Sequence, residues 1–133
     1  MRGRCAAALL VVAAAVMAGC ESEDHPNEDR PASPVELSAR INDGKVVVAP
    51  DTVGAGLAVV TISNQASDEV ELNFDGPGKD RQTNQIPPGG VSSIKLALDQ
   101  GDYTVEPDVG SISSGELAVG EPRPSAQNDL LLP

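Results

Sequence analysis

Residues 86–105 read IPPGGVSSIKLALDQGDYTV, and this stretch decides the fold. The opening Pro-Pro-Gly-Gly indicates a turn, after which Ile94, Leu96 and Leu98 occupy every second position. Alternation with a period of two predicts a strand with one face in a core and the other in water. Asp-Gln-Gly then predicts a turn. A second strand follows, in which Tyr103 and Val105 have the same spacing.

The same pattern extends over the region from residue 35 to residue 120. In the segment 69–74, for example, Val70, Leu72 and Phe74 alternate with Glu69, Glu71 and Asn73. No part of this region has the 3.6-residue period of an amphipathic helix. Further strands are expected at residues 36–41, 45–49, 57–63 and 117–119.

Turn residues separate these segments. They lie at Pro50-Asp51, Gly54-Ala55-Gly56, Asn64 to Asp68 and Asp99-Gln100-Gly101. About seven short strands, spaced by roughly 8–12 residues, predict an all-β fold, a Greek-key β-sandwich. The Gly-rich, charged gap at residues 75–85 is expected to be an exposed crossover loop.

The N-terminus has the pattern of an export signal. A basic start, MRGR, precedes an apolar run from Cys5 to Ala18, and Gly19 then leads to Cys20. This order of regions is typical of a secretory signal, and the run is shorter than the roughly 20 residues of a transmembrane helix. An ordinary signal with a chance cysteine and a short uncleaved anchor are the alternatives.

The cysteine at the end of the signal resembles the lipobox of bacterial lipoproteins, although Met17 stands where Leu is usual. The resemblance implies a signal peptide at residues 1–19 and a lipidated, palmitate-bearing Cys20. It also implies a cell-membrane location on the extracytoplasmic face. Two acyl chains hold a protein stably on a bilayer, whereas one does so only marginally.

Polar segments flank the expected sandwich. Residues 20–34 are acidic and contain prolines, so we expect a solvated linker. Residues 121–133 are also rich in proline and polar residues and are expected to form a flexible tail. Its Leu130-Leu131-Leu132 run leaves open a docking strand.

Charge and cysteine content exclude several classes of function. Without residues 1–19, the chain has 7 basic and 20 acidic residues, a net charge of −13. Such a chain is repelled by nucleic acids. With Cys5 in the signal and Cys20 lipidated, the domain has no disulfide, so its stability depends on a hydrophobic core.

Three local patterns resemble the cupredoxin-like domains of exported bacterial proteins. Residues 48–56 (VAPDTVGAG) are similar to the first strand and the Ala-Gly step of that family. Residues 60–64 (VTISN) are similar to a later strand. IPPGG at residues 86–90, followed by residues 96–103, is similar to its third motif. The resemblance implies a Greek-key sandwich.

The copper ligands of that family do not carry over. A blue-copper centre uses two imidazoles and a thiolate, with a weak axial Met. The resemblance assigns these ligands to Val70 and to the neighbourhoods of Pro107 and Ser111. The one histidine, His25, lies in the linker, and Met17 lies in the signal. We therefore expect no metal ligands and no cofactor in the domain.

A second resemblance competes at the level of topology. The sequence DQGDY, ending at Tyr103, resembles the tyrosine corner of immunoglobulin-like domains. There the hydroxyl of the tyrosine bonds back to the main chain at a Greek-key corner. An immunoglobulin-like sandwich is therefore the alternative fold.

Catalysis and calcium binding find little support in the residues. A Ser nucleophile needs a base such as His, and Ser111, Ser113 and Ser114 lack an elbow motif. We therefore expect no enzyme activity. Calcium needs six to eight converging oxygens. The acidic candidates for it are Asp75, Asp80, Asp99, Asp102, Glu106 and Asp108.

The sequence therefore predicts a lipid-anchored binding or interaction protein. Its expected partners are membrane lipid, through acylated Cys20, and an unidentified protein or envelope component, with no nucleic acid. The polar face that carries Glu69, Glu71 and Asn73 is the candidate recognition surface. The alternatives are a metal-associated surface protein, handling calcium or copper, and an accessory subunit of an envelope complex.

Overall fold

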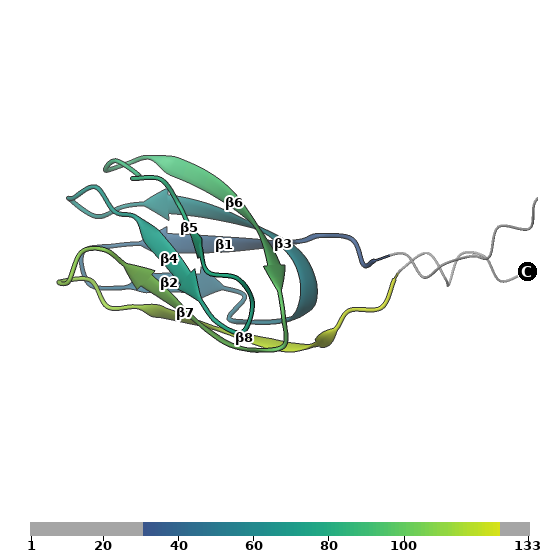
Figure 1. The fold of residues 1–133 in the computed structure, drawn as a ribbon. Coiled ribbons are helices and arrows are strands. Elements are labelled where there is room, and N and C mark those ends of the chain that lie inside the picture. The colour runs from purple at the N-terminus through teal and green to yellow at the C-terminus, as the bar shows by residue number, and fades with distance from the viewer. Residues whose placement is uncertain (1–30, 126–133) are drawn as a thin grey trace, which may run out of the picture.

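A computed structural model describes residues 31–125, which form an all-β sandwich (Figure 1). No helix long and apolar enough to span a membrane occurs among these residues. The eight strands are β1 (Val35–Ile41), β2 (Val46–Ala49), β3 (Thr52–Asn64), β4 (Leu72–Asp75), β5 (Arg81–Gln82), β6 (Val91–Leu98), β7 (Gly101–Pro107) and β8 (Gly115–Pro122). The predicted fold class is confirmed.

The strands form two layers that share β3 (Figure 1). One layer has the order β2-β1-β3-β6, and the other has the order β3-β8-β7-β4-β5. β3 runs parallel to β1 and to β8, whereas its pairing with β6 is antiparallel. The layers also meet at a second edge, where Val46 N–H donates to the carbonyl of Ser113 at 2.9 Å.

The glycine pair at residues 54–56 corrects one prediction. A turn was expected at Gly54-Ala55-Gly56, but these residues lie inside the 13-residue strand β3. The register with β8 shifts between Gly54 and Ala55, and Gly56 has a φ of 135°. Glycine adopts this conformation at little cost, and an irregularity of this kind bends a strand instead of reversing it. The bend lets β3 pass from one layer to the other.

Alternating apolar residues of both layers form the core, as predicted. Val70, Leu72 and Phe74 are at most 1% exposed. Leu96 and Leu98 are also buried, whereas Ile94 is only partly covered because it lies toward the start of β6, an edge strand. With one Phe and one Tyr in the chain, aliphatic side chains make up most of this core.

The segment 75–85 is more ordered than a plain crossover loop, so this prediction is wrong in part. It contains β5, which pairs with β4 through Asn73 and Phe74. Thr83 is buried, and its Oγ1 accepts a hydrogen bond from Leu72 N–H at 3.0 Å. Thr83 N–H in turn donates to the Leu72 carbonyl at 2.9 Å. A hydrogen bond between a side chain and a distant main-chain group follows no repeating spacing in the sequence, so the order of this segment could not be predicted from the pattern of apolar residues.

Tyr103 forms the predicted corner. Its hydroxyl oxygen accepts hydrogen bonds from Asp99 N–H at 2.9 Å and from Gly78 N–H at 3.2 Å. The ring lies against Gly76, where an added Cβ would stand 2.3 Å from a ring carbon. One buried side chain therefore joins the turn before β7 to the loop after β4.

Candidate functional site

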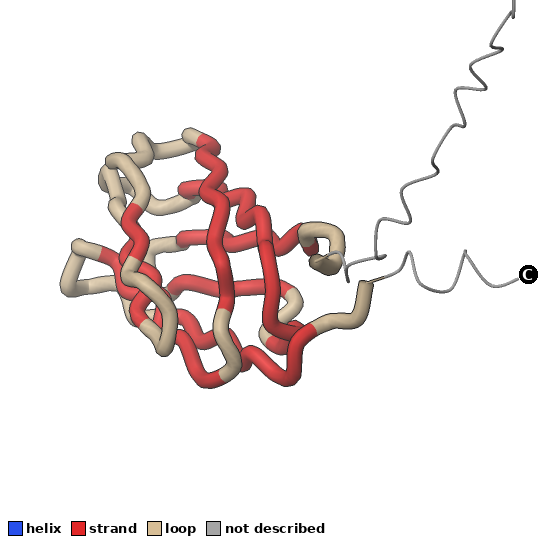
Figure 2. The backbone as a smooth tube through the Cα atoms, turned by 45° about the vertical axis from the view of Figure 1, so that its right-hand side comes forward, coloured by secondary structure: helices blue, strands red, loops and turns tan. Residues whose placement is uncertain are grey.

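One end of the sandwich carries the two ends of the described chain, and the opposite end carries loops (Figures 1 and 2). Both ends of the described chain, near Pro31 and Ser125, lie at one end, which we call the terminal end. The loops at residues 65–71, 85–90 and 108–114 lie at the opposite end, which we call the loop end. The positions that the resemblance assigns to copper ligands lie here: Val70 and Ser111 in these loops, and Pro107 at the end of β7.

Val70, the position of the expected first ligand, belongs to the apolar interior. It is 0% exposed, and it exchanges two backbone hydrogen bonds with Ile86, at 3.1 and 2.9 Å. Ile86 is itself buried. A side chain without donor atoms therefore fills this position and contributes to the hydrophobic core.

The other two expected positions also lack metal donors. Pro107 ends β7 and stands opposite Leu72 in the register. Ser111 is exposed, while its neighbour Ile112 is buried and Val109 packs against the core. Residues 31–125 contain no His, Cys or Met. The donor set of this part of the chain therefore does not fit a blue-copper centre.

Asn64 and Asp108 organise the loop end. Asn64 is 0% exposed, its amide donates to the carbonyls of Asp68 and Ile86 at 2.8 and 2.7 Å, and its Oδ1 accepts from Ala66 N–H at 2.9 Å. This residue ends the second motif of the cupredoxin-like resemblance. Its three bonds fix the start of one loop against Ile86 in another.

Asp108 joins the loop after β7 to two other segments. Its Oδ1 accepts from Glu71 N–H at 2.8 Å, and its Oδ2 accepts from the Gln85 side-chain amide at 2.7 Å. Asp108 N–H donates back to the Glu71 carbonyl at 3.0 Å. Slight desolvation acts to raise the pKa of Asp108, which is largely exposed, but these hydrogen bonds outweigh it and lower the pKa below its usual value.

The acidic residues proposed for calcium are not brought together. No group of three or more His, Cys, Asp or Glu side chains within residues 31–125 has the arrangement of a metal site. Asp108 is engaged by Glu71 and Gln85, while Asp75 and Asp102 lie on strands β4 and β7. Dispersed carboxylates do not supply the converging oxygens that calcium needs.

The outer side of the layer that contains β4 is polar, as predicted. It includes residues of β7 and β8 in addition to Glu69, Glu71 and Asn73. Val70, Leu72 and Phe74 point inward, so Asn73 lies on the outer side of β4, opposite Glu106 of β7. Glu71 accepts a hydrogen bond from the Gln82 side chain. The outer side of this layer carries four exposed carboxylates, which we call the acidic face: Asp75, Asp102, Glu106 and Glu116.

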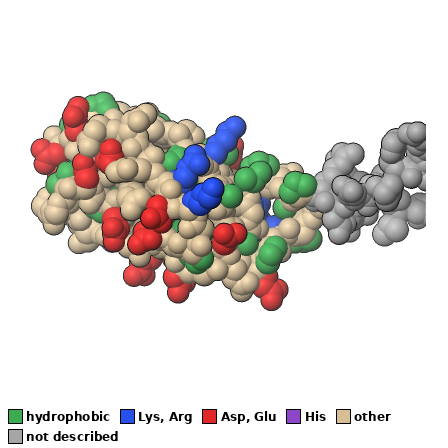
Figure 3. Space-filling view, in the orientation of Figure 1, with side chains coloured by type: hydrophobic (Ala, Val, Ile, Leu, Met, Phe, Trp, Pro, Cys, Tyr) green, Lys and Arg blue, Asp and Glu red, His purple; other side chains and the backbone are tan. Residues whose placement is uncertain are grey.

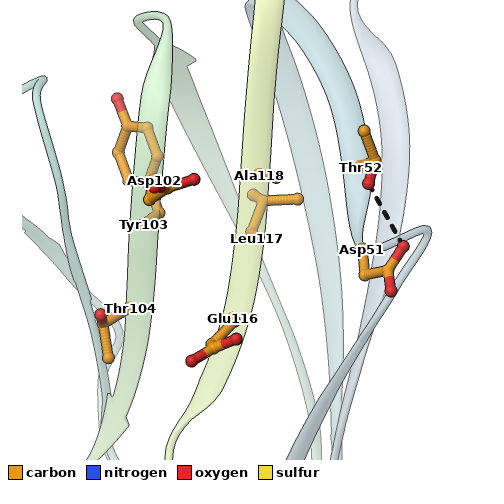
Figure 4. Close-up of a pocket in the computed structure, with 8 residues that line it drawn as sticks. All are labelled: Asp51, Thr52, Asp102, Tyr103, Thr104, Glu116, Leu117 and Ala118. Carbon is orange, nitrogen blue, oxygen red and sulfur yellow. Dashed lines mark hydrogen bonds between the residues drawn. The ribbon is translucent and has the colours of Figure 1, made fainter.

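A shallow hollow of about 360 Å³ lies on the acidic face (Figure 4). Asp51, Asp102 and Glu116 line it together with Thr52 and Thr104. These side chains come from β7, from β8, from the start of β3 and from the turn before it, so a sequence pattern confined to one strand could not reveal the hollow. Figure 3 shows acidic side chains spread over the molecule, with Lys and Arg gathered in the middle of the face in view.

Comparisons with known proteins bear on the fold alone. No protein-family model matches the chain, and no curated protein matches it either. Among solved structures, a multicopper oxidase superposes with a TM-score of 0.52 and 15% identity, over 68% of this chain and 46% of that one. The described chain thus corresponds to about half of that oxidase.

Two further structures are similar at lower TM-scores. Auracyanin from Roseiflexus castenholzii has a TM-score of 0.46 and 12% identity, over 68% of this chain and 99% of that one. A blue copper oxidase from Nitrosomonas europaea has a TM-score of 0.49 and 12% identity, over 75% and 43%. Together with the strand order, the likeness to the multicopper oxidase shows that residues 31–125 have a cupredoxin-like fold.

Proposed function

We propose that this protein is a lipid-tethered interaction module on the extracytoplasmic face of the cell membrane. In this proposal residues 1–19 are the signal peptide, Cys20 carries the acyl chains, and the sandwich binds a protein partner without metal or catalysis. The sequence around Cys20 is the observation that carries it, because a cysteine directly follows the small residues of an export signal.

The arrangement of the two ends supports the tether. The N-terminal segment joins the sandwich at the terminal end, where Arg123 donates to the Ser33 carbonyl at 2.7 Å. Residues 21–34 span at most about 50 Å when stretched. A tether at Cys20 would therefore attach the sandwich at its terminal end, away from the loop end, through a linker long enough to hold the domain clear of the lipid headgroups.

Replacement of Cys20 tests the anchor. Cys20→Ala should release the protein from membranes or leave it unprocessed, and intact-mass measurement of the wild-type protein should show a diacylated Cys20. Cys5→Ala is the matched control, because Cys5 lies in the signal and should be dispensable. Membrane retention of a cleaved Cys20→Ala protein would contradict the proposal.

The acidic face is the surface we assign to the partner. Its four carboxylates contrast with the outer side of the other layer, where β1 and β6 carry Glu36, Arg40 and Lys95. Four carboxylates on one face favour a partner with a basic surface, with Arg81 of β5 at the edge of the same layer as the one opposite charge on its strands. Such binding weakens as salt rises.

Crosslinking in intact cells tests this assignment. The triple variant Asp102→Asn, Glu106→Gln and Glu116→Gln should lose most of the crosslinked partner, whereas Glu36→Gln should retain it. Equal capture by both variants would exclude the acidic face. Loss of capture by Glu36→Gln alone, with normal folding, would mean that the partner binds on the other layer.

A further inference from the structure

A mainly apolar groove lies at the terminal end. Its volume is about 370 Å³, and its walls come from three strands and from the segment before β1. Ala55 and Leu57 of β3, Ala97 and Leu98 of β6, and Pro122 of β8 line it. Figure 3 shows hydrophobic side chains gathered where the described chain ends.

The groove contains an exposed large hydrophobic side chain, that of Leu57. It is 46% exposed, and the other large hydrophobic residue exposed within residues 31–125 is Val91, at 68%. Leu57 stands opposite Ala97 in the β3–β6 register, so the two form an apolar pair on the outer side of the layer. An apolar side chain laid on this pair would remove the surface of Leu57 from water.

The chain itself supplies a matching segment close by. Leu130, Leu131 and Leu132 lie outside the described residues, in the polar tail. The described chain stops at Ser125, two residues after Arg123, which also lines the groove. Five residue steps from Ser125 to Leu130 span at most about 17 Å. The leucines are therefore within reach, and Asn128-Asp129 before them is a pair that favours a turn.

Arg123 and Asp99 both line the groove, so its rim carries both signs of charge, and the Arg123 side favours the same segment. Arg123 donates to the carbonyls of Gly54 at 3.2 Å, Leu57 at 2.6 Å and Ser33 at 2.7 Å. All three acceptors are neutral, so the guanidinium keeps its positive charge beside the groove. Asp129, directly before the leucines, supplies a carboxylate of opposite charge.

We propose that Leu130-Leu131-Leu132 docks into the groove formed by Leu57, Ala97 and Leu98 of the same chain. We call the docked segment the strap. This inference does not rest on the lipid anchor, and it assigns an occupant to the apolar groove.

A spin label tests the strap. The chain from Glu21 onward keeps the entire described core and lacks both cysteines, so Pro133→Cys creates a unique labelling site. With a nitroxide there, the amide signals of Leu57 and Ala97 should broaden at least twofold more than in the triple variant Leu130→Ser, Leu131→Ser, Leu132→Ser. The triple variant keeps the tail length and changes only its apolar surface.

Variants of the groove complete the experiment. Leu57→Ser should reduce the broadening, whereas Val91→Ser should leave it unchanged, because both remove one exposed apolar side chain but only Leu57 lines the groove. Dispersed amide signals show that each variant is folded. Equal broadening with and without the leucines would overturn the proposal. So would broadening that appears only in an unlabelled chain mixed with a labelled one, because it would place the tail of a second copy in the groove.

Discussion

Arg123 and Tyr103 each hold main-chain groups from distant segments with one side chain. Arg123 reaches Gly54 and Leu57 in β3 and Ser33 before β1. It passes close over Gly56, where an added Cβ would stand 2.8 Å from a guanidinium nitrogen. The arginine therefore holds the bend of β3, the entry of the chain and the end of β8 together.

Removal of this side chain should destabilise the domain. Arg123→Ala loses three hydrogen bonds from a charged donor to carbonyl oxygens, and because the site is partly exposed we expect a loss of about 2 kcal/mol in the free energy of unfolding. Urea denaturation measures it. Arg40→Ala, an exposed arginine of β1, is the control and should change stability by less than about 0.5 kcal/mol. Equal losses in both variants would contradict the role of Arg123.

Tyr103→Phe isolates the hydroxyl of the corner. The ring packing against Gly76 remains, but the N–H groups of Asp99 and Gly78 lose their acceptor. Partly buried donors left without a partner cost about 1–3 kcal/mol in total. The urea midpoint should fall while the slope of the unfolding transition stays constant. An unchanged midpoint would mean that water replaces the hydroxyl without loss.

At the scale of elements, Asp108 couples β7 to the start of β4 and to Gln85. The pKa of Asp108 is lower in the folded chain than its ordinary value of 3.8. Its ionised form is therefore bound more tightly by the folded state. This contribution to stability is present above pH about 4 and is lost as the pH falls through the lowered pKa.

Asp108→Asn should reveal this coupling as a pH-dependent difference. At pH 7 the variant should be less stable by about 1 kcal/mol, a modest figure because the residue is exposed. Urea denaturation below pH 3 should bring the two proteins closer, because the wild-type carboxylate is then protonated. A difference that is independent of pH would show that the charge of Asp108 plays no part.

At the scale of the whole molecule, a cupredoxin-like sandwich lacks a donor set for copper in residues 31–125. The position expected for the first ligand holds Val70 within the core, and Asn64 and Asp108 hold the loop end through hydrogen bonds. The stability of this end therefore depends on packing and hydrogen bonds, which need no ion.

Metal addition should leave the purified domain unchanged. Neither Cu²⁺ nor Ca²⁺ at ten times the protein concentration should raise the melting temperature, because a ligand stabilises a fold only by binding its native state. Differential scanning calorimetry checks this, with Mg²⁺ as the control for non-specific ionic effects. A rise of several degrees with Ca²⁺ alone would point to a site in the acidic loops.

Strand positions and core residues were accessible from the sequence, because the alternation of apolar and polar side chains is local. Leu72, Phe74, Leu96 and Tyr103 could each be assigned to the core by counting along the chain. The turn proposed at Gly54–Gly56 failed because two glycines signal a departure from regular backbone without saying whether the strand reverses or bends.

The sequence by itself therefore determined the fold class, the alternating burial of most strands and the lack of histidine and thiol donors in the sandwich. Only the tertiary structure decided which distant groups meet: Arg123 with Ser33, Asp108 with Gln85, and Leu57 with the other walls of an apolar groove. The physical reason is range. The burial of a strand residue can be predicted from the polarity of its neighbours in the sequence. Arg123 and Ser33 are 90 residues apart in the sequence, and they meet in the fold, in which β3 passes from one layer to the other.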